Sequence, residues 1–131
     1  MTVIVCLDNA NGMMFNHRRQ SRDANVVKDI LKTINGASLL IAPYSEPLFS
    51  QAECSDSFLA DADAKDYCFV ENTSVAKFKE KISKLVIYKW NRDYPADFYF
   101  DIDYTNDYKL ETMLDFGGTS HDKITKEVYV R

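Results

Sequence analysis

The sequence predicts a three-layer α/β fold, in which helices flank a mixed, mainly parallel sheet that ends in antiparallel strands. Short apolar runs rich in β-branched residues, such as residues 2–7, are typical of strands buried on both faces. Segments with helical spacing separate these runs, so neighbouring strands are expected to run parallel. The final run, residues 124–130, alternates apolar and polar side chains as an antiparallel or edge strand does.

The first elements are a strand over residues 2–7 and a helix over residues 23–34. The strand ends in turn residues that include Asn11-Gly12, a pair that tolerates positive φ. Apolar residues then recur on one helical face at Val26, Val27, Ile30, Leu31 and Ile34. Ser21 or Asp23 is the expected N-cap, and Asn35-Gly36 supplies the left-handed stop. The stretch between the strand and the helix is expected to be a loop.

The middle of the chain predicts strands over residues 38–42, 67–70 and 84–90. A short helix is expected to begin with Ser45-Glu46-Pro47 and to continue to about residue 51. Residues 52–66 carry five acids and little periodicity, which indicates a loop. A further helix, capped by Thr73 or Ser74, is expected before the strand at 84–90.

The last third predicts strands over residues 109–114 and 124–130. No repeat, linker or low-complexity stretch interrupts the chain, so residues 1–131 are expected to form one domain.

Composition excludes several classes of protein. A hydrophobic content of 46% with four Gly and three Pro excludes a disordered or collagen-like chain. No apolar run approaches the roughly 18–20 residues of a membrane span, and no signal-peptide pattern opens the chain. Three cysteines without a C-x-x-C pair disfavour a disulfide framework and a structural zinc site, so a cytoplasmic setting is expected. A net charge of −4 disfavours nucleic acids and anionic membranes as partners.

The order of elements resembles a shortened dihydrofolate reductase. The matching features are the opening strand with its turn, the helix that begins at Asp23, the strand-to-helix junction at Ser45, the segment Asp97-Phe98-Tyr99-Phe100, and Ser120-His121 before the last strand. The resemblance implies a single dihydrofolate reductase-like domain and places Asp23 where that family holds the pterin ring.

The same resemblance fails at both of the family's phosphate-binding devices. Ala42-Pro43-Tyr44-Ser45 stands where the family has a Gly-Arg-x-Thr turn, and Pro43 brings neither a guanidinium nor a backbone donor. Glu71-Asn72-Thr73 replaces a run of glycines at the pyrophosphate site, where a carboxylate repels a diphosphate. We therefore expect the fold without NADPH-dependent reductase activity, and no bound cofactor.

The segment 11–16 and the end 123–129 are also similar to small bacterial proteins, some of them labelled ribonuclease Z. A nuclease of that type needs clustered His and Asp ligands for two metal ions. The sequence has only His17 and His121, far apart in the chain, so no metal site is expected.

The best candidate for a ligand site is the loop Asn16–Asp23 at the mouth of the sheet. Arginines near a helix N-terminus suit a small anion; the alternative is that they pair with the acidic residues of the last third of the chain. Asp23 is explained by capping alone or orients a ligand, and His121 is a surface residue or a catalytic one. The candidate ligand-binding residues are Asn16, His17, Arg18, Arg19, Arg22, Asp23 and His121.

An alternative function is a protein-interaction module that uses the aromatic and acidic surface of residues 90–107. Its candidate interface residues are Trp90, Tyr94, Phe98 and Tyr99, which also suit core and edge-strand packing. An enzyme that depends on a pterin or a nucleotide is the third hypothesis, and the absence of the phosphate-binding devices disfavours it.

Overall fold

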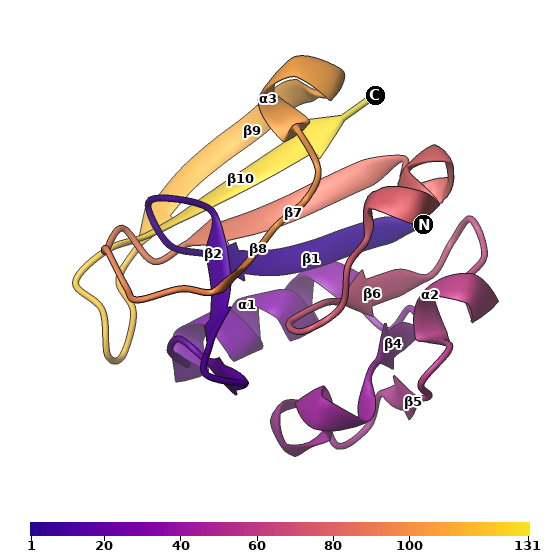
Figure 1. Ribbon diagram of the computed structural model, residues 1–131, viewed down its shortest axis with the longest axis horizontal. Coiled ribbons are helices and arrows are strands. Elements are labelled where there is room, and N and C mark those ends of the chain that lie inside the picture. Colours follow the sequence, from indigo (N-terminus) through magenta and orange to yellow (C-terminus); the bar gives the residue numbers. More distant parts are fainter.

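The computed structural model describes residues 1–131 and is built around a seven-stranded sheet in the order β5-β4-β6-β1-β7-β10-β9 (Figure 1). A second, three-stranded sheet has the order β3-β2-β8. The strands are β1 (Thr2–Leu7), β2 (Gly12–Phe15), β3 (Arg18–Arg19), β4 (Leu39–Ile41), β5 (Glu53–Cys54), β6 (Tyr67–Phe69), β7 (Lys84–Lys89), β8 (Phe98–Tyr99), β9 (Lys109–Phe116) and β10 (Ile124–Val130).

The pairing of the large sheet confirms the mixed, mainly parallel arrangement. Strand β1 lies between β6 and β7 and is parallel to both, while β10 is antiparallel to β7 and to β9. The carboxyl ends of β1, β4, β6 and β7 therefore meet at one edge of the sheet. That edge is where open α/β folds place their ligands.

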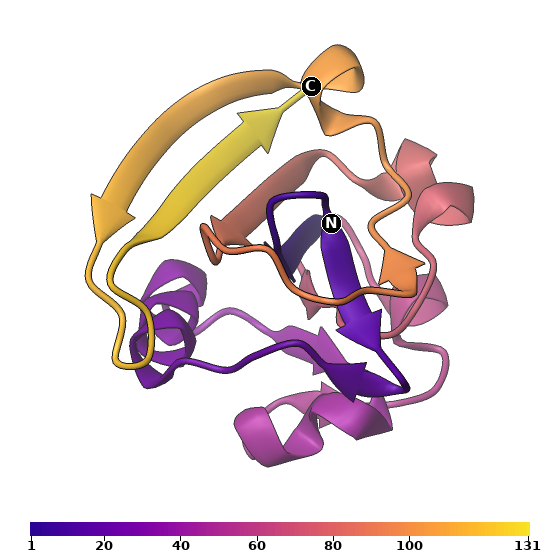
Figure 2. The same cartoon turned by 60° about the vertical axis from the view of Figure 1, so that its left-hand side comes forward.

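The predicted first helix is confirmed as α1 (Ala24–Ile34). Asp23 is its N-cap and accepts a hydrogen bond from the N–H of Asn25, while Asn35 ends it in the left-handed conformation. Its buried residues Val26, Ile30 and Ile34 pack against one face of the sheet. Figure 2 shows the loop between β9 and β10 reaching the start of this helix.

Alternate side chains of the central strands enter two separate cores, which makes the domain three-layered. Ile4 of β1 packs with α1, whereas Val3 and Val5 face the other side. That second side is covered by α2 (Phe58–Asp61), the 3₁₀ helix η2 (Ala76–Lys81), α3 (Tyr104–Asp107) and the segment around β8.

Three predicted elements of the middle of the chain need correction. The helix expected from Ser45 is a 3₁₀ helix, η1 (Pro43–Leu48), which begins at Pro43 because proline is preorganised for a first helical position. The expected loop at 52–66 contains β5 and α2, where Phe58 and Leu59 are buried. The helix expected from Thr73 or Ser74 is η2, and Ser74 binds Asp101 instead of capping it.

The predicted loop before α1 is wrong in its first half, which is a β-hairpin. Met14 pairs with Arg19 and Phe15 with Arg18, so the turn contains only Asn16 and His17. Both turn residues have positive φ, 52° and 62°, as a type I′ turn requires. Residues 14–19 therefore form a regular β-hairpin and not an irregular loop.

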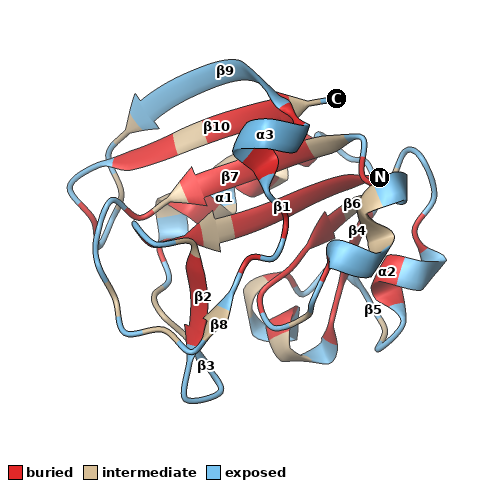
Figure 3. Cartoon of the chain, turned by 45° about the horizontal axis from the view of Figure 1, so that its top comes forward, coloured by how far each residue is buried: buried red, intermediate tan, exposed pale blue.

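Burial divides the sheet between its centre and one edge (Figure 3). Strands β1, β7 and β10 are mostly buried, whereas β9 is exposed along seven of its eight residues. The register between β9 and β10 shifts at a bulge, which is common on edge strands. None of the helices has the length and apolar character that crossing a membrane requires.

Candidate functional site

A pocket lies between α1, the ends of β1, β6 and β7, and the segment 19–23. It measures about 430 Å³ including its solvent-filled mouth, and packed side chains leave room for only about one water molecule inside. Nine of its fifteen lining residues are apolar: Cys6, Met13, Val26, Val27, Ile30, Leu48, Phe69, Val70 and Trp90. The polar ones are Arg19, Gln20, Ser21, Arg22, Asp23 and Glu71. We call this cavity the α1 pocket.

The carboxylate of Asp23 is completely buried and fully hydrogen-bonded. Its Oδ1 accepts from the N–H groups of Asn25 and Thr119, both at 2.9 Å, and from the Thr119 hydroxyl. Its Oδ2 accepts from the N–H of Ser120 at 2.9 Å and lies 3.0 Å from Nδ1 of His121. Asp23 therefore caps α1 and also fastens the β9–β10 turn to it, which leaves no free oxygen to orient a ligand.

These contacts keep Asp23 ionised. Burial by itself raises the pKa of a carboxyl group, but here the N–H groups of Thr119 and Ser120 and the ring of His121 outweigh it. The pKa of Asp23 lies well below its usual range. The site consequently holds a permanent negative charge beside an imidazole.

His121 is buried and is held on every side. Its Nδ1 faces Asp23, and its Nε2 lies 2.9 Å from the hydroxyl of Tyr94 and 3.2 Å from Oγ of Ser21. The ring stacks on Trp90 with a centroid distance of 4.5 Å. A surface position for His121 is therefore excluded. A neutral ring that donates from Nδ1 to Asp23 keeps Nε2 as an acceptor for the two hydroxyl groups.

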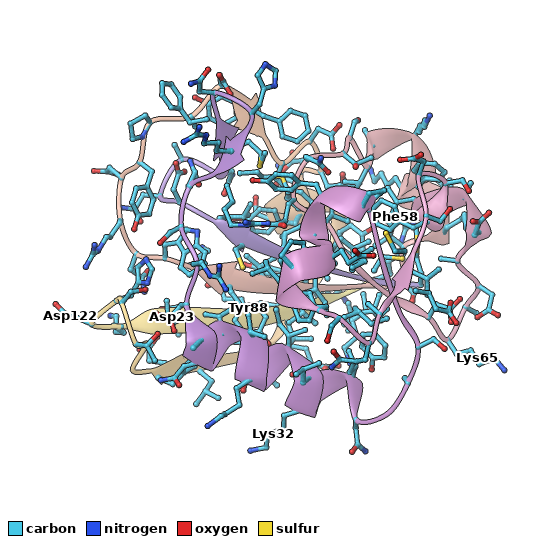
Figure 4. The ribbon with its side chains drawn as sticks, turned by 90° about the horizontal axis from the view of Figure 1, so that it is seen from below. Asp23, Lys32, Phe58, Lys65, Tyr88 and Asp122 are labelled. Carbon is cyan, nitrogen blue, oxygen red and sulfur yellow. The ribbon has the colours of Figure 1, made fainter.

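The turn that carries His121 depends on a glycine. A Cβ added to Gly118 would collide with Oδ2 of Asp23 and with the carbonyl oxygen of His121. Figure 4 shows Asp23 at the start of α1 and Asp122, next to His121, at the same end of the molecule. The missing side chain at Gly118 is thus what lets the turn approach the helix.

Arg19 and Glu71 also line the α1 pocket. The guanidinium of Arg19 donates to both oxygens of Glu71, from Nε at 2.8 Å and from Nη2 at 3.0 Å, and lies over the ring of Tyr44. Glu71 also accepts from the buried hydroxyl of Ser45 at 2.7 Å. Hydrogen bonding to Glu71 raises the pKa of Arg19, so the guanidinium stays charged.

The structure separates the predicted ligand-binding residues into two groups. Asn16, His17 and Arg18 are exposed at the hairpin tip, outside the α1 pocket, whereas Arg19, Arg22 and Asp23 line it. The three arginines do not converge on one point, and none pairs with the acidic residues of the last third of the chain. Arg19 is neutralised by Glu71, while Arg18 and Arg22 form no ion pair.

The predicted aromatic interface is largely internal. Trp90 is only 4% exposed and forms a wall of the α1 pocket, so it is not available to a partner, because its ring is covered by His121. Tyr94 and Phe98 are half-buried, and Tyr99 alone is well exposed, at 50%.

Gln20 and Ser21 lie within the predicted loop Asn16–Asp23 but were not named among its ligand-binding residues, and Glu71 was not predicted as a member of the site. Nε2 of Gln20 donates to Asp8 and to the carbonyl oxygen of Pro95, which fixes Oε1 as an acceptor that is buried and has no partner. The sequence contains no spacing that links these residues to one another. Ser21 lies two residues from Asp23, but its partner His121 is 100 residues away.

No protein-family model and no curated protein sequence matches the chain. Among solved structures, it is similar to a dihydrofolate reductase from Enterococcus faecalis in complex with NADP(H) and RAB-propyl. The TM-score is 0.70 over 99% of this chain and 95% of the other, at 13% sequence identity. The chain thus has a dihydrofolate reductase-like fold, as the order of its elements predicts.

Proposed function

We propose that the protein binds a small anion with an apolar body in the α1 pocket, and that it is not an NADPH-dependent reductase. The observation that carries the proposal is the composition of the pocket, in which apolar walls surround a rim with one unpaired guanidinium. An apolar cavity with a few convergent polar groups is the usual form of a small-molecule site.

The polar groups of the rim suit a ligand that carries both a negative charge and a hydrogen-bond donor. Arg22 is exposed, forms no ion pair and lies at the pocket beside the N-terminus of α1, where a negative charge is favoured. Oε1 of Gln20 offers a fixed acceptor that nothing in the chain satisfies. Trp90 and Phe69 supply aromatic walls, so a planar aromatic carboxylate fits this set of groups.

Ligand entry requires the Arg19 side to open. The interior holds about one water molecule as it stands, and the Arg19–Glu71 pair borders it. The Asp23 side of the pocket opens less easily, because six hydrogen-bond contacts converge on the buried Asp23 carboxylate. Arg19 is therefore the gate of the pocket, and Arg22 is the anion contact.

Two features support the absence of reductase activity. Pro43 is exposed at the first position of η1, where the resembling family has its phosphate-binding turn. Glu71, which replaces a glycine of that family, carries a charge that is already engaged by Arg19 and Ser45. A dinucleotide phosphate placed there would face a carboxylate and no free N–H cradle.

A thermal-shift titration with indole-3-acetate tests the proposal. The compound should raise the Tm of the wild-type protein with increasing concentration, because it binds only the folded state. Arg22→Ala should lose this shift, while Lys32→Ala, which removes an exposed charge from the outer side of α1 (Figure 4), should keep it. NADPH should give no shift; a saturable NADPH shift would refute the non-reductase part.

A protein-interaction function remains the second candidate, and one observation favours it. Phe15 and Tyr99 are 48% and 50% exposed on adjacent strands of the small sheet, Phe15 beside the hairpin tip and Tyr99 opposite Gly12 at the other end of β2. Under this alternative, Phe15→Ser with Tyr99→Ser abolishes binding of the partner protein in a titration and leaves the indole-3-acetate shift unchanged. Loss of the small-molecule shift in this variant would count against the alternative.

We do not propose a metal-dependent nuclease. His17 lies exposed at the hairpin tip and His121 lies buried against Asp23, so the two histidines do not share a site. No three His, Cys, Asp or Glu side chains gather as metal ligands. Two-metal hydrolysis needs such a cluster to activate water.

A further inference from the structure

Ser21, His121 and Asp23 form a continuous hydrogen-bonded chain at the wall of the α1 pocket. Oγ of Ser21 lies 3.2 Å from Nε2 of His121, and Nδ1 of the same ring lies 3.0 Å from Oδ2 of Asp23. The hydroxyl is on the Nε2 side and the carboxylate on the Nδ1 side. This is the arrangement by which serine hydrolases activate their nucleophile, and it recurs on unrelated folds.

Asp23 has the charge, and His121 the ring position, that activation of a serine requires. Asp23 is ionised and held in place by the N–H groups of Asn25, Thr119 and Ser120, so it can orient the ring and stabilise an imidazolium. The ring of His121 is kept in position by stacking on Trp90. With its proton on Nδ1, the imidazole presents Nε2 as a base toward Ser21.

The nucleophile is also the member of the chain that the pocket reaches. Ser21 is half-buried and lines the α1 pocket, whereas His121 and Asp23 are buried behind it. The backbone N–H groups of Arg22 and Asp23, the next two residues, donate no hydrogen bond within the chain. Unpaired N–H groups next to a nucleophile are donors for the oxyanion of an acyl-transfer intermediate.

We propose that Ser21 is the nucleophile of an acyl-transfer centre, with His121 as its base and Asp23 as the residue that orients the base. The substrate class is an ester of a small apolar carboxylic acid. The proposal rests on the proposed function in one respect: the acyl group occupies the α1 pocket, so that its carboxylate product is the kind of anion that Arg22 accepts.

The reaction balances with water as the only second reactant. Oγ of Ser21 forms a bond to the ester carbonyl carbon while its proton passes to Nε2 of His121. The C–O bond to the alcohol then breaks, and the alcohol leaves with that proton. Water attacks the acyl-Ser21 in the same way, and the acid is released as the proton returns to Oγ.

Tyr94 competes with Ser21 for the single lone pair of Nε2. Its hydroxyl is the closer of the two, at 2.9 Å against 3.2 Å. If His121 acts as the base for Ser21, Tyr94→Phe removes the hydroxyl group that competes for Nε2. The reactivity of Ser21 must then stay the same or increase. If His121 exists only to hold Tyr94 and Asp23 in place, Ser21 has the reactivity of any surface serine.

Labelling with a fluorophosphonate reagent tests the proposal on the wild-type protein. The reagent transfers its phosphonyl group to an activated serine oxygen with loss of fluoride. Intact-mass and peptide-mass analysis should show a single adduct, on Ser21. Ser21→Ala should abolish the adduct and lower the hydrolysis of p-nitrophenyl acetate at least about 100-fold. Ser57→Ala, an exposed serine in the loop before α2, and Tyr94→Phe should both keep the adduct.

Absence of an adduct on wild-type Ser21, or an adduct elsewhere that survives in Ser21→Ala, overturns the proposal. The result is separable from the proposed function, because the adduct reports on the Ser21 oxygen of the wild-type protein, whereas the Tm shift with indole-3-acetate reports on anion binding at Arg22. A Tm shift without labelling refutes only the acyl transfer. Labelling without a Tm shift refutes only the anion site.

Discussion

The segment Arg19–Asp23 is held at each end by a contact with a distant residue. At one end Arg19 forms an ion pair with Glu71, and at the other Asp23 is hydrogen-bonded to His121; the two contacts differ in nearly every respect. Asp23 and His121 have side chains that are 0% and 1% exposed, whereas Arg19 and Glu71 are 21% and 9% exposed. Backbone N–H groups from two elements converge on Asp23. Glu71 receives side-chain donors only, from Arg19 and Ser45.

The difference shows which side of the α1 pocket can move. Removing a hydrogen-bond donor from the fully buried Asp23 carboxylate leaves an uncompensated charge in the interior, while water can replace the partner of the Arg19 guanidinium, which is 21% exposed. We therefore expect the Asp23 end to be a fixed wall that positions Ser21 and His121. We expect the Arg19 end to act as the proposed gate and to open at modest cost.

The largest expected effect comes from removing the charge at the wall. Asp23→Asn should lower the free energy of unfolding by about 3 kcal/mol, because it removes the carboxylate that Thr119, Ser120 and His121 share. Urea unfolding followed by far-UV circular dichroism measures the change. If Asp23→Asn lowers the free energy of unfolding no more than substitution of an exposed residue does, the Asp23 side of the pocket is not fixed.

The stability difference between the wild type and Asp23→Asn should depend on pH. The pKa of Asp23 is lower in the folded protein than its unfolded value of about 4, so its stabilisation is present above that pH and is lost as the pH falls. The stability gap between the wild type and Asp23→Asn should thus narrow below about pH 4. Urea midpoints measured from pH 7 to pH 3 test this, and a gap that widens in acid would contradict it.

A smaller effect is expected at the glycine that brings the turn to the helix. Gly118→Ala should cost about 2 kcal/mol, since the new methyl group must displace backbone and the Asp23 carboxylate. Gly117→Ala is the matched control, because a Cβ there meets nothing closer than 3.9 Å. Equal Tm values for the two variants would exclude the tight approach.

Substitution of Arg19, the proposed gate, should change the free energy of unfolding little and the rate of ligand association more. Arg19→Met should cost about 1 kcal/mol, as expected for a partly exposed pair. It should also speed the association of indole-3-acetate in stopped-flow measurements of Trp90 fluorescence, because the closing guanidinium is gone. Unchanged association kinetics would mean that ligand enters elsewhere.

The smallest effect is expected at the hairpin tip, which precedes the gate in the chain. His17 has φ of 62°, a conformation that glycine adopts without strain. His17→Gly should raise the stability by about 0.5 kcal/mol. The change should not alter ligand binding, since His17 lies outside the α1 pocket. A change in ligand affinity would place the tip within the site after all.

Prediction from sequence succeeded where a local pattern and its burial agree. The stripe of Val26, Ile30 and Ile34 between Asp23 and Asn35 defines α1 nearly to the residue. It failed at residues 12–19, which contain no apolar alternation, because the hairpin there is held by pairing with β8 and by its turn geometry. It also failed at α2, which is too short for periodicity to show, and it found η1 but placed it later in the chain than Pro43–Leu48.

The sequence by itself determined the class of fold and the identity of the polar groups, because burial patterns and capping residues act over a few positions. It also indicated that Asp23 caps a helix and that the phosphate-binding residues of the resembling family are missing. Only the tertiary structure decided that His121 reaches Ser21 and Asp23, and that Glu71 takes Arg19 out of the predicted arginine cluster. Those contacts join residues 52 to 100 positions apart, and their geometry follows from how the sheet and α1 pack.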